Sequence, residues 1–479
     1  MLYVFSRGCI RKLMRENKVL LKNTVLYSIG SFGTKILIYF LVPIYTYYMT
    51  TADYGIADMS VLLLQIVSIL LTGKIASALV RFSLGNKEKG PDYFTNSLFV
   101  VFVTFLFVLG LCFILSLTSF SRPELLPIFP VLYILFNLYE CLTEYVKAID
   151  HSLVYVIAGL LYSICLFITN ILLLNKVGGT VQVYLLSQIV SYSVAILFVI
   201  VAVKIRTIPI IGKVDFVLIK DMLRYSIYLA PAALLLWIIQ SSDRYMVAWL
   251  IGTSDAGIYG AAYKIPSICA ALVAVFGSAW HISASHEENN EKYHSEMFHF
   301  YIMISVLASG TIILLANVFS MSLFKADFIE AKKYVPLLIF AHLFSYLQTF
   351  LEMILIARKM SKDIFTSVIV GSITNIILNL FLIKRIGIWG AIVATLVCYL
   401  YIFLNRYCIL RQRNWIGKIK WNEYLSFALV ATQALIYSCN ISYVWLISVF
   451  LWVICIGLYN KEINRVILFV FRVMREKRK

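Results

Sequence analysis

The sequence predicts an all-α polytopic membrane protein with about 14 transmembrane helices: two parallel six-helix lobes around a central cavity, plus two extra C-terminal helices. Its 479 residues are 61% hydrophobic and 14% charged, and the mean hydropathy is +0.88. A soluble protein is about half apolar and about a quarter charged, so this chain lacks the charge to cover a water-exposed surface. Regular apolar runs and an uneven distribution of lysine and arginine between them indicate the same class.

Each spanning helix needs about 20 predominantly apolar residues. Reading the apolar runs against charged or turn-rich segments gives fourteen predicted spans, of which the last two are the shortest. In chain order they are 25–48, 56–79, 94–117, 125–148, 154–174, 181–203, 222–251, 256–282, 298–319, 334–356, 364–386, 388–410, 424–439 and 444–458.

The spans divide the chain into six regions. These are a basic cytoplasmic arm (1–24), an N-lobe with spans one to six (25–203), a cytoplasmic linker (204–221), a C-lobe with spans seven to twelve (222–410), the last two spans with a preceding basic loop (411–458), and a basic amphipathic tail (459–479). The tail has an apolar centre between basic residues, which favours a position along the cytoplasmic headgroups.

Lysine and arginine fix the expected orientation, because they accumulate in cytoplasmic loops. With both termini inside, 31 of the 42 basic residues fall on the cytoplasmic side and seven on the other. One span inserted wrongly near the start would destroy this asymmetry. The net charge of +18 is thus mostly a signal of topology, and no nucleic-acid partner is needed to explain it.

Two short motifs recur in the chain. The sequence LYSIG (26–30) resembles RYSIY (224–228), and DYGI (53–56) resembles DAGI (255–258) at an offset of 202 residues. In each half, the motif of the LYSIG type is expected to open a span. The motif of the DYGI type is expected to form the external turn before the next span. Since each half then holds an even number of spans, the halves are parallel repeats about an axis along the membrane normal.

Four basic residues remain inside spans, where a charge at the helix centre costs about 2.5–3.5 kcal/mol. We expect them to face a hydrated cavity or carboxylates, and a cationic cavity suits an anionic substrate. They are Lys35, Lys74, Arg244 and Lys264.

Five carboxylates lie in the predicted spans: Asp58, Glu140, Glu144, Asp243 and Glu352. Asp243 and Glu352 are the two most expected to balance the cavity cations or to take part in ion coupling. Glu140, Glu144 and Lys147 share one helix face, so a local ion pair between Glu144 and Lys147 is an equal alternative. Asp243 and Arg244 are adjacent and point about 100° apart, so at least one needs a partner on another helix or a ligand.

Other residues complete the predicted site. Arg81 and Ser77 share a helix face with Lys74 in the second span. The polar cavity lining is expected to include Gln240, Gln348, Asn375 and Asn379, with hydrogen bonds between helices as the alternative role. Prolines within spans can act as hinges for alternating access, and they are Pro43, Pro231 and Pro266.

The chain also resembles a known family. NTVLYSIGSFGTKILIYFLVPIYTYYMTTADYGIADM (23–59) resembles the opening of O-antigen and capsular polysaccharide flippases, and SSDRYMVAWLIGTSDAGIYGAAYKIPS (241–267) resembles the motif of their second half. These flippases belong to the multidrug/oligosaccharidyl-lipid/polysaccharide exporter superfamily, which includes the lipid II flippases. The resemblance covers the chain in span order, with specific motifs only in spans one, two, seven and eight.

The resemblance implies a flippase of undecaprenyl-diphosphate-linked sugar repeat units in the bacterial plasma membrane. It implies that Lys35, Lys74 and Lys264 correspond to lumen cations of the lipid II flippases; Lys74 is the loosest match. Expected partners are lipid-linked sugars and membrane lipids, with a polysaccharide polymerase or glycosyltransferases as further candidates. The protein is expected to be a monomer without a cofactor or metal, and a coupling ion would be H⁺ or Na⁺.

Three alternatives remain. A multidrug exporter of the same superfamily would share the lobes but gain little from buried cations, and a lipid II flippase would share the diphosphate group. A membrane enzyme such as a polysaccharide polymerase would need a catalytic surface outside the bilayer, for which the short loops leave little room. The six histidines show no metal-binding pair at i, i+4 spacing.

Overall fold

The computed structural model describes residues 30, 33–34, 36–37, 39–118, 122–205, 212–286, 290–438 and 443–465. Across these residues the secondary structure is helical, and the strand-like pairing consists of one isolated bridge between Met49 and Gly179. The all-α prediction is therefore confirmed. The chain forms two compact units, one of Val25–Ala261 with Lys325–Phe328 and the other of Ala262–Phe324 with the described residues from Ile329 onward.

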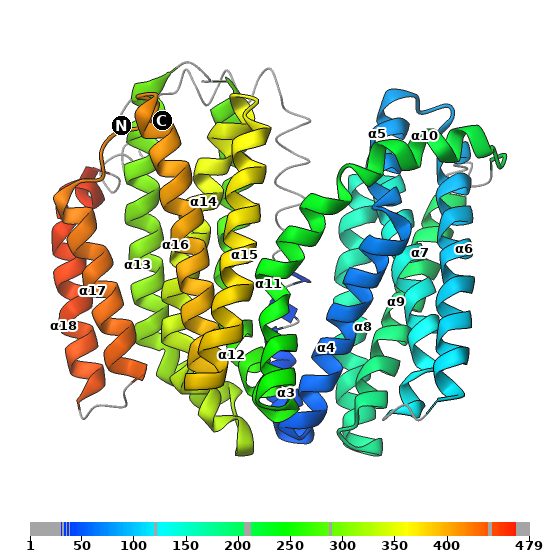
Figure 1. Cartoon of the computed structure of the whole chain (residues 1–479), viewed down its shortest axis with the longest axis horizontal. Helices are drawn as coiled ribbons and strands as arrows, with labels where there is room; N and C mark the ends of the chain where they lie inside the picture. The colour runs from blue at the N-terminus through cyan, green and yellow to red at the C-terminus, as the bar shows by residue number, and fades with distance from the viewer. Residues whose placement is uncertain are drawn as a thin grey trace, which may run out of the picture. The chain divides into compact units, whose positions relative to one another are not determined.

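The first unit packs its helices around α4, α7 and α9 (Figure 1). The long helices α8 and α9 lie against each other, α6 lies against α7, and α4 contacts α11. Its helices are α3 (Val42–Tyr48), α4 (Thr51–Thr72), α5 (Ile75–Gly85), α6 (Gly90–Ser116), the short 3₁₀ helix η1 (Pro123–Leu125), α7 (Ile128–Ala148), α8 (Ser152–Val177), α9 (Val181–Ile205), α10 (Phe216–Ile227), α11 (Ala230–Leu250) and the start of α12 (Thr253–His286).

The second unit is built on α14 and α16, which pack closely and carry α15 and α17. The last two helices, α17 and α18, lie side by side next to α13 (Figure 1). Besides the remainder of α12, its helices are α13 (Glu291–Leu323), the 3₁₀ helix η2 (Ala326–Lys333, whose first residues belong to the other unit), α14 (Val335–Ala357), α15 (Ser361–Ile386), α16 (Ile388–Gln412), α17 (Trp421–Ser438) and α18 (Val444–Leu458).

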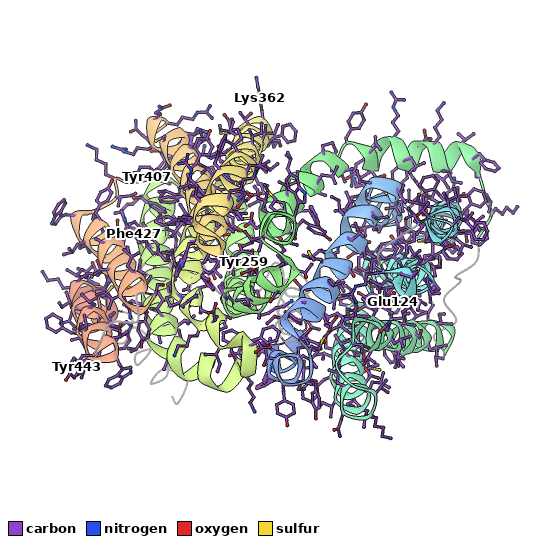
Figure 2. All side chains as sticks on the ribbon, turned by 60° about the horizontal axis from the view of Figure 1, so that its bottom comes forward. Glu124, Tyr259, Lys362, Tyr407, Phe427 and Tyr443 are labelled. Atoms are coloured by element: carbon purple, nitrogen blue, oxygen red, sulfur yellow. The ribbon has the colours of Figure 1, made fainter. Side chains whose placement is uncertain are left out.

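Helix length and composition confirm a multi-pass membrane protein. Among the described residues, nine helices are long and apolar enough to cross a membrane, or ten if the bent pair α10–α11 forms one span. Large apolar side chains are exposed on the outer faces, for example Phe107 and Phe113 on α6 and Phe381 on α15. Charged side chains project from helix ends, as Lys362 does at the start of α15 (Figure 2).

The span predicted at 25–48 is interrupted at Leu41, after which α3 begins, and two further spans also differ from single straight helices. The span predicted at 56–79 is interrupted where Gly73 and Lys74 both take left-handed backbone angles, with φ of 57° and 60°. A left-handed residue ends the α-helical hydrogen-bond pattern, so α4 stops at Thr72 and Lys74 is the N-cap of α5. Lys74 therefore does not share a helix face with Ser77 and Arg81, and that prediction is wrong.

The span predicted at 222–251 bends by 44° between α10 and α11. The motif at 224–228 lies at the end of α10, so it closes a helix rather than opening a span. Its partner motif at 26–30 lies almost wholly outside the described residues. The stretch predicted as the linker includes the start of α10, which Asp215 caps by accepting from the amides of Val217 and Leu218.

The second pair of repeat motifs forms one helix crossing within the first unit. Gly55 on α4 and Gly257 on α12 are equivalent positions, and a Cβ on Gly55 would lie 2.3 Å from the carbonyl oxygen of Thr253. A Cβ on Gly257 would lie 1.9 Å from the carbonyl oxygen of Thr51, which is the repeat equivalent of Thr253. The two contacts are reciprocal, as a twofold relation requires, and the hydroxyls of Thr51 and Ser254 lie 2.6 Å apart.

Candidate functional site

The adjacent charges Asp243 and Arg244 are both buried on α11, with exposures of 2% and 6%. They point to different neighbours, as their angular separation requires. Arg244 Nε lies 3.3 Å from Oδ2 of Asp58 on α4, and Asp58 is itself only 5% exposed. Asp243 Oδ2 accepts a hydrogen bond of 3.0 Å from the hydroxyl of Tyr259 on α12.

A close approach of three helices creates the Asp58–Arg244 pair. A Cβ on Gly260 would lie 3.2 Å from Asp58 Oδ2 and 3.8 Å from Arg244 Nε, so glycine leaves the space that the two side chains occupy. Gly260 is also the repeat equivalent of Asp58, at the offset of 202 residues. Beside the pair, Trp237 Nε1 donates to the carbonyl oxygen of Leu62 at 3.1 Å, and the Tyr245 hydroxyl donates to that of Met59.

Tyrosines surround the same carboxylate. The ring of Tyr45 lies 5.7 Å from that of Tyr54 and 4.9 Å from that of Tyr184. All three phenols interact electrostatically with Asp58. Burial removes most of the water that would screen these interactions. A proton or a charged ligand that binds in this cluster would therefore interact strongly with its charged groups.

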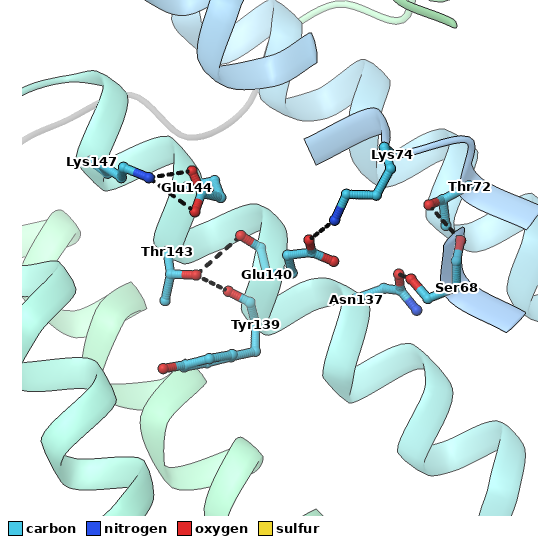
Figure 3. Close-up of polar contacts among 9 residues, drawn as sticks. All are labelled: Ser68, Thr72, Lys74, Asn137, Tyr139, Glu140, Thr143, Glu144 and Lys147. Carbon is cyan, nitrogen blue, oxygen red and sulfur yellow. Dashed lines mark hydrogen bonds and ion pairs between the residues drawn. The ribbon is translucent and has the colours of Figure 1, made fainter. Parts of the chain in front are cut away.

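A second charge cluster lies where α5 begins (Figure 3). The Lys74 ammonium lies 2.9 Å from Oε1 of Glu140 on α7, and both side chains are a little over a quarter exposed. One turn further along α7, Glu144 pairs with Lys147 at 3.1 Å, which confirms the local pair. Ser68 also donates to the Asn137 side-chain oxygen at 2.6 Å, so polar contacts join α4 and α7 across this region.

A third cluster, the Arg406 cluster, lies in the second unit. Arg406 on α16 is fully buried. Its Nη1 donates to the Gln348 carbonyl oxygen at 3.0 Å and to the Gln348 side-chain oxygen at 2.7 Å. It also lies 2.7 Å from Glu352 Oε2, and Nε donates to the Ser367 hydroxyl at 3.1 Å. Arg406 lies near the end of the predicted span 388–410 and is one of the 31 basic residues assigned above to the cytoplasmic side. That assignment is wrong, because the side chain lies inside the helix bundle.

The remaining predicted site residues are Lys35, Lys264, Gln240, Asn375 and Asn379. Lys35 is outside the described residues. Lys264 is half-buried on α12, and Gln240 is exposed on α11 although it lies one turn from the buried Arg244. Asn375 and Asn379 are fully buried and bond to each other along α15, with 3.1 Å from the Asn379 amide to the Asn375 oxygen.

The three prolines occupy different helix positions. Pro43 and Pro231 lie in the first turns of α3 and α11, where proline costs little because the missing N–H has no helical partner. Pro266 is inside α12. Its carbonyl oxygen accepts a hydrogen bond of 3.0 Å from the Tyr346 hydroxyl.

Sequence reasoning missed the partners of both buried arginines. Asp58 was one of five carboxylates in the spans, but Asp243 and Glu352 were preferred. The repeat held a usable signal, because the position equivalent to Asp58 is glycine and glycine permits close helix approach. No comparable signal marks Arg406, since its position near a helix end matches that of an ordinary cytoplasmic arginine.

Several of the predicted site charges form ion pairs within the described residues. Arg244 faces Asp58, Lys74 faces Glu140, and Glu352 faces an arginine outside the predicted cavity set. Within the described residues, no group of three histidine, cysteine or carboxylate side chains has the geometry to hold a metal ion. What the Asp58–Arg244 pair can do chemically is bind an anion at the guanidinium and a proton at the carboxylate.

Comparison with known proteins gives one family and one fold. A family model described as "Polysaccharide biosynthesis protein" matches residues 20–281, which is more than half of the chain. No curated protein matches the chain.

Three solved structures are similar over most of the chain. The lipid II flippase MurJ, in an inward closed conformation, has a TM-score of 0.70 at 14% identity and covers 93% of this chain and 100% of its own. An inward-facing multidrug resistance MATE family transporter of the MOP superfamily has a TM-score of 0.61 at 12% identity, covering 80% of this chain and 95% of its own. A MOP superfamily transporter from Pyrococcus furiosus has 0.58 at 12% identity, covering 82% and 95%. At these low identities, the structural similarity shows a shared fold.

Proposed function

Because the chain belongs to the polysaccharide biosynthesis protein family, we propose that it is a flippase that moves undecaprenyl-diphosphate-linked oligosaccharide repeat units across the bacterial plasma membrane. The repeat units would serve the synthesis of a surface polysaccharide, namely O-antigen, capsule or exopolysaccharide. The match over residues 20–281 is the observation that carries the proposal. The fold, which is similar to that of a lipid II flippase over its whole chain, supports a transport role rather than an enzymatic one.

Arg244 is the residue most suited to the diphosphate. Guanidinium groups bind phosphate oxygens in a bidentate manner, and this one is held in a dry surrounding where such a contact is strong. We further propose Lys35, Lys74 and Lys264 as diphosphate-binding cations, and alternating access with both termini cytoplasmic as the mechanism. The carboxylates Asp243, Glu140 and Glu144 then serve charge balance.

Two related functions are tested against this one. The solved multidrug resistance transporter of similar fold favours a drug exporter as the second candidate. The lipid II flippase of similar fold favours lipid II as the cargo. Buried arginine is a poor surface for cationic drugs, since like charges repel in a dry site.

The deciding experiment is transport in proteoliposomes that hold the purified full-length protein. A fluorescent undecaprenyl-diphosphate oligosaccharide is placed in both leaflets, and a membrane-impermeant quencher reports which molecules reach the outer face. The protein should accelerate loss of the protected fraction, while fluorescent lipid II and a cationic dye should move at the rate of empty liposomes.

Variants of the cations locate the diphosphate site. Arg244→Gln and Lys264→Gln should each reduce transport at least about tenfold, since each removes a charge-assisted contact, and a tenfold effect is about 1.4 kcal/mol. Lys362→Gln, at an exposed helix start, should keep the wild-type rate. Thermal unfolding in detergent checks that each variant is folded. Faster movement of lipid II or of the dye than of the oligosaccharide lipid would refute the proposed cargo.

A further inference from the structure

The Asp58 carboxylate has no role in the proposed binding of diphosphate, yet it faces the guanidinium that would bind it. Its Oδ2 lies 3.3 Å from Arg244 Nε, and both side chains are only 7% exposed. A Cβ on Gly260 would lie only 3.2 Å from the same oxygen. Glycine at this position therefore places no side chain between Asp58 and Arg244. Any anion that reaches Arg244 therefore arrives beside Asp58.

An ionised Asp58 and a diphosphate at one buried guanidinium would place like charges side by side in a medium of low dielectric constant. Such a neighbour strongly favours the neutral form of a carboxyl group. Resting on the proposed function, we propose that Asp58 is a proton-binding residue of the transport cycle, which takes up one proton when the diphosphate group binds at Arg244 and releases it when the cargo leaves. The proton comes from the aqueous phase and returns to it, so the step needs no other reactant.

The groups around Asp58 are consistent with this exchange. The charged group that contacts Asp58 is the guanidinium of Arg244 on α11, and Asp243 is the next residue along that helix. Among the described residues, four phenols also interact with Asp58, and a phenol is neutral near pH 7 in its ordinary range; these are Tyr45, Tyr54, Tyr184 and Tyr245. Protonation of Asp58 would thus leave the Arg244 cation free to be balanced by the cargo.

The other carboxylates of the first unit are less suited to this role. Glu140 and Glu144 face lysine ammonium groups on side chains that are a quarter or more exposed, so water can screen a change of charge there. Asp243 accepts a hydrogen bond from the Tyr259 hydroxyl on α12. Asp58 faces the proposed diphosphate-binding arginine directly.

The sign of the pH dependence follows from linkage. If bound cargo requires a protonated Asp58, cargo affinity is constant below the pKa of Asp58 in the empty protein and falls by about tenfold per pH unit above it. By reciprocity, cargo binding raises the pKa of Asp58 and draws protons from solution.

Binding is measured on the full-length protein in lipid nanodiscs, with farnesyl-diphosphate-linked N-acetylglucosamine as the probe. Its two phosphates are both esterified and stay ionised over the pH range used, so its own titration does not contribute. The wild-type protein should bind the probe more tightly at pH 5.5 than at pH 7.5, and binding in weak buffer should take up about one proton per protein. Asp58→Asn should bind with little dependence on pH and without proton uptake.

A matched control is Glu423→Gln in the second unit, where another buried carboxylate, 1% exposed, pairs with His299. This variant should keep the pH dependence and the proton uptake. Wild-type binding without pH dependence, or an Asp58→Asn variant that still takes up the proton, would overturn the inference. The wild-type measurement decides the matter even if Asp58→Asn does not fold. Failure of the proposed function is recognised separately, because the fluorescent oligosaccharide lipid would then not be transported at any pH.

Discussion

Two buried arginines of this protein show how the same residue type can have different roles. Arg244 contacts a carboxylate on a neighbouring helix beside tyrosines. Arg406 donates to Ser367, to both oxygens of Gln348 and to Glu352, so it links α14, α15 and α16. A guanidinium engaged by so many acceptors is held in place, and we assign Arg406 a structural role.

Arg406→Met should therefore destabilise the protein by about 3–5 kcal/mol, because removal of one partner leaves the other buried charge and its hydrogen-bond acceptors uncompensated. The measurement is the shift of thermal unfolding in detergent. Adding Glu352→Leu should restore at least about half of the loss, since an apolar pair of similar volume avoids the desolvation cost. Lys362→Met is the control and should leave stability unchanged. Equal stability of wild type and Arg406→Met would exclude the structural role.

At the scale of helices, the crossing of α4 and α12 depends on two glycines. The reciprocal approach of Gly55 and Gly257 to backbone oxygens brings the two helix starts together and sets the positions of Asp58 and Gly260 one turn further on. The start of α4 is also fixed locally, because the Thr50 hydroxyl accepts from the Asp53 amide and donates to the Asp53 carboxylate. This reciprocal pair is a capping arrangement that satisfies a free N–H of the first turn.

Gly257→Ala should force these helices apart, because the new Cβ would overlap the Thr51 carbonyl oxygen, a backbone atom that cannot rotate away. We expect the free energy of unfolding to fall by about 1–3 kcal/mol. The transport rate should fall by at least the fraction of protein lost to unfolding, since the Asp58–Arg244 pair would be displaced. Gly110→Ala on α6 is the matched control, as its Cβ would meet no atom within 4 Å, and alanine should stabilise that helix by about 0.5–1 kcal/mol. If both variants melt at the wild-type temperature, the crossing is not a close contact.

The sequence predicted most helices but not their interruptions or their partners. Long apolar runs such as 94–117 and 388–410 can satisfy their backbone in a membrane only as helices, which explains why α6 and α16 match their predicted spans closely. The interruption at Lys74 was missed because a left-handed lysine has no sequence signal beyond the preceding glycine. The Asp58–Arg244 and Glu352–Arg406 pairs were missed because residues 186 and 54 positions apart meet only through tertiary packing.

At the scale of the whole molecule, the remaining question is which ends of the helices face the cytoplasm. The structure supplies helices of sufficient length, such as α15, whose 26 residues extend about 39 Å. Orientation depends on the distribution of lysine and arginine, and removing Arg406 from the cytoplasmic count leaves the asymmetry almost unchanged. Because both ends of α15 carry exposed basic residues, this helix allows a direct test of the predicted orientation.

In a variant without native cysteines, Lys362→Cys at the start of α15 and Lys384→Cys near its end should label from opposite sides of the membrane. The topology with both termini inside places residue 384 outside, so a membrane-impermeant maleimide should label Lys384→Cys in intact cells and Lys362→Cys only after permeabilisation. Tyr443→Cys, in the exposed turn before α18, should behave like residue 384, and Asn414→Cys, after α16, like residue 362. Both comparisons use exposed positions, so a difference reports the side of the membrane rather than burial. The reverse labelling pattern would contradict the predicted orientation, because it would place both termini outside.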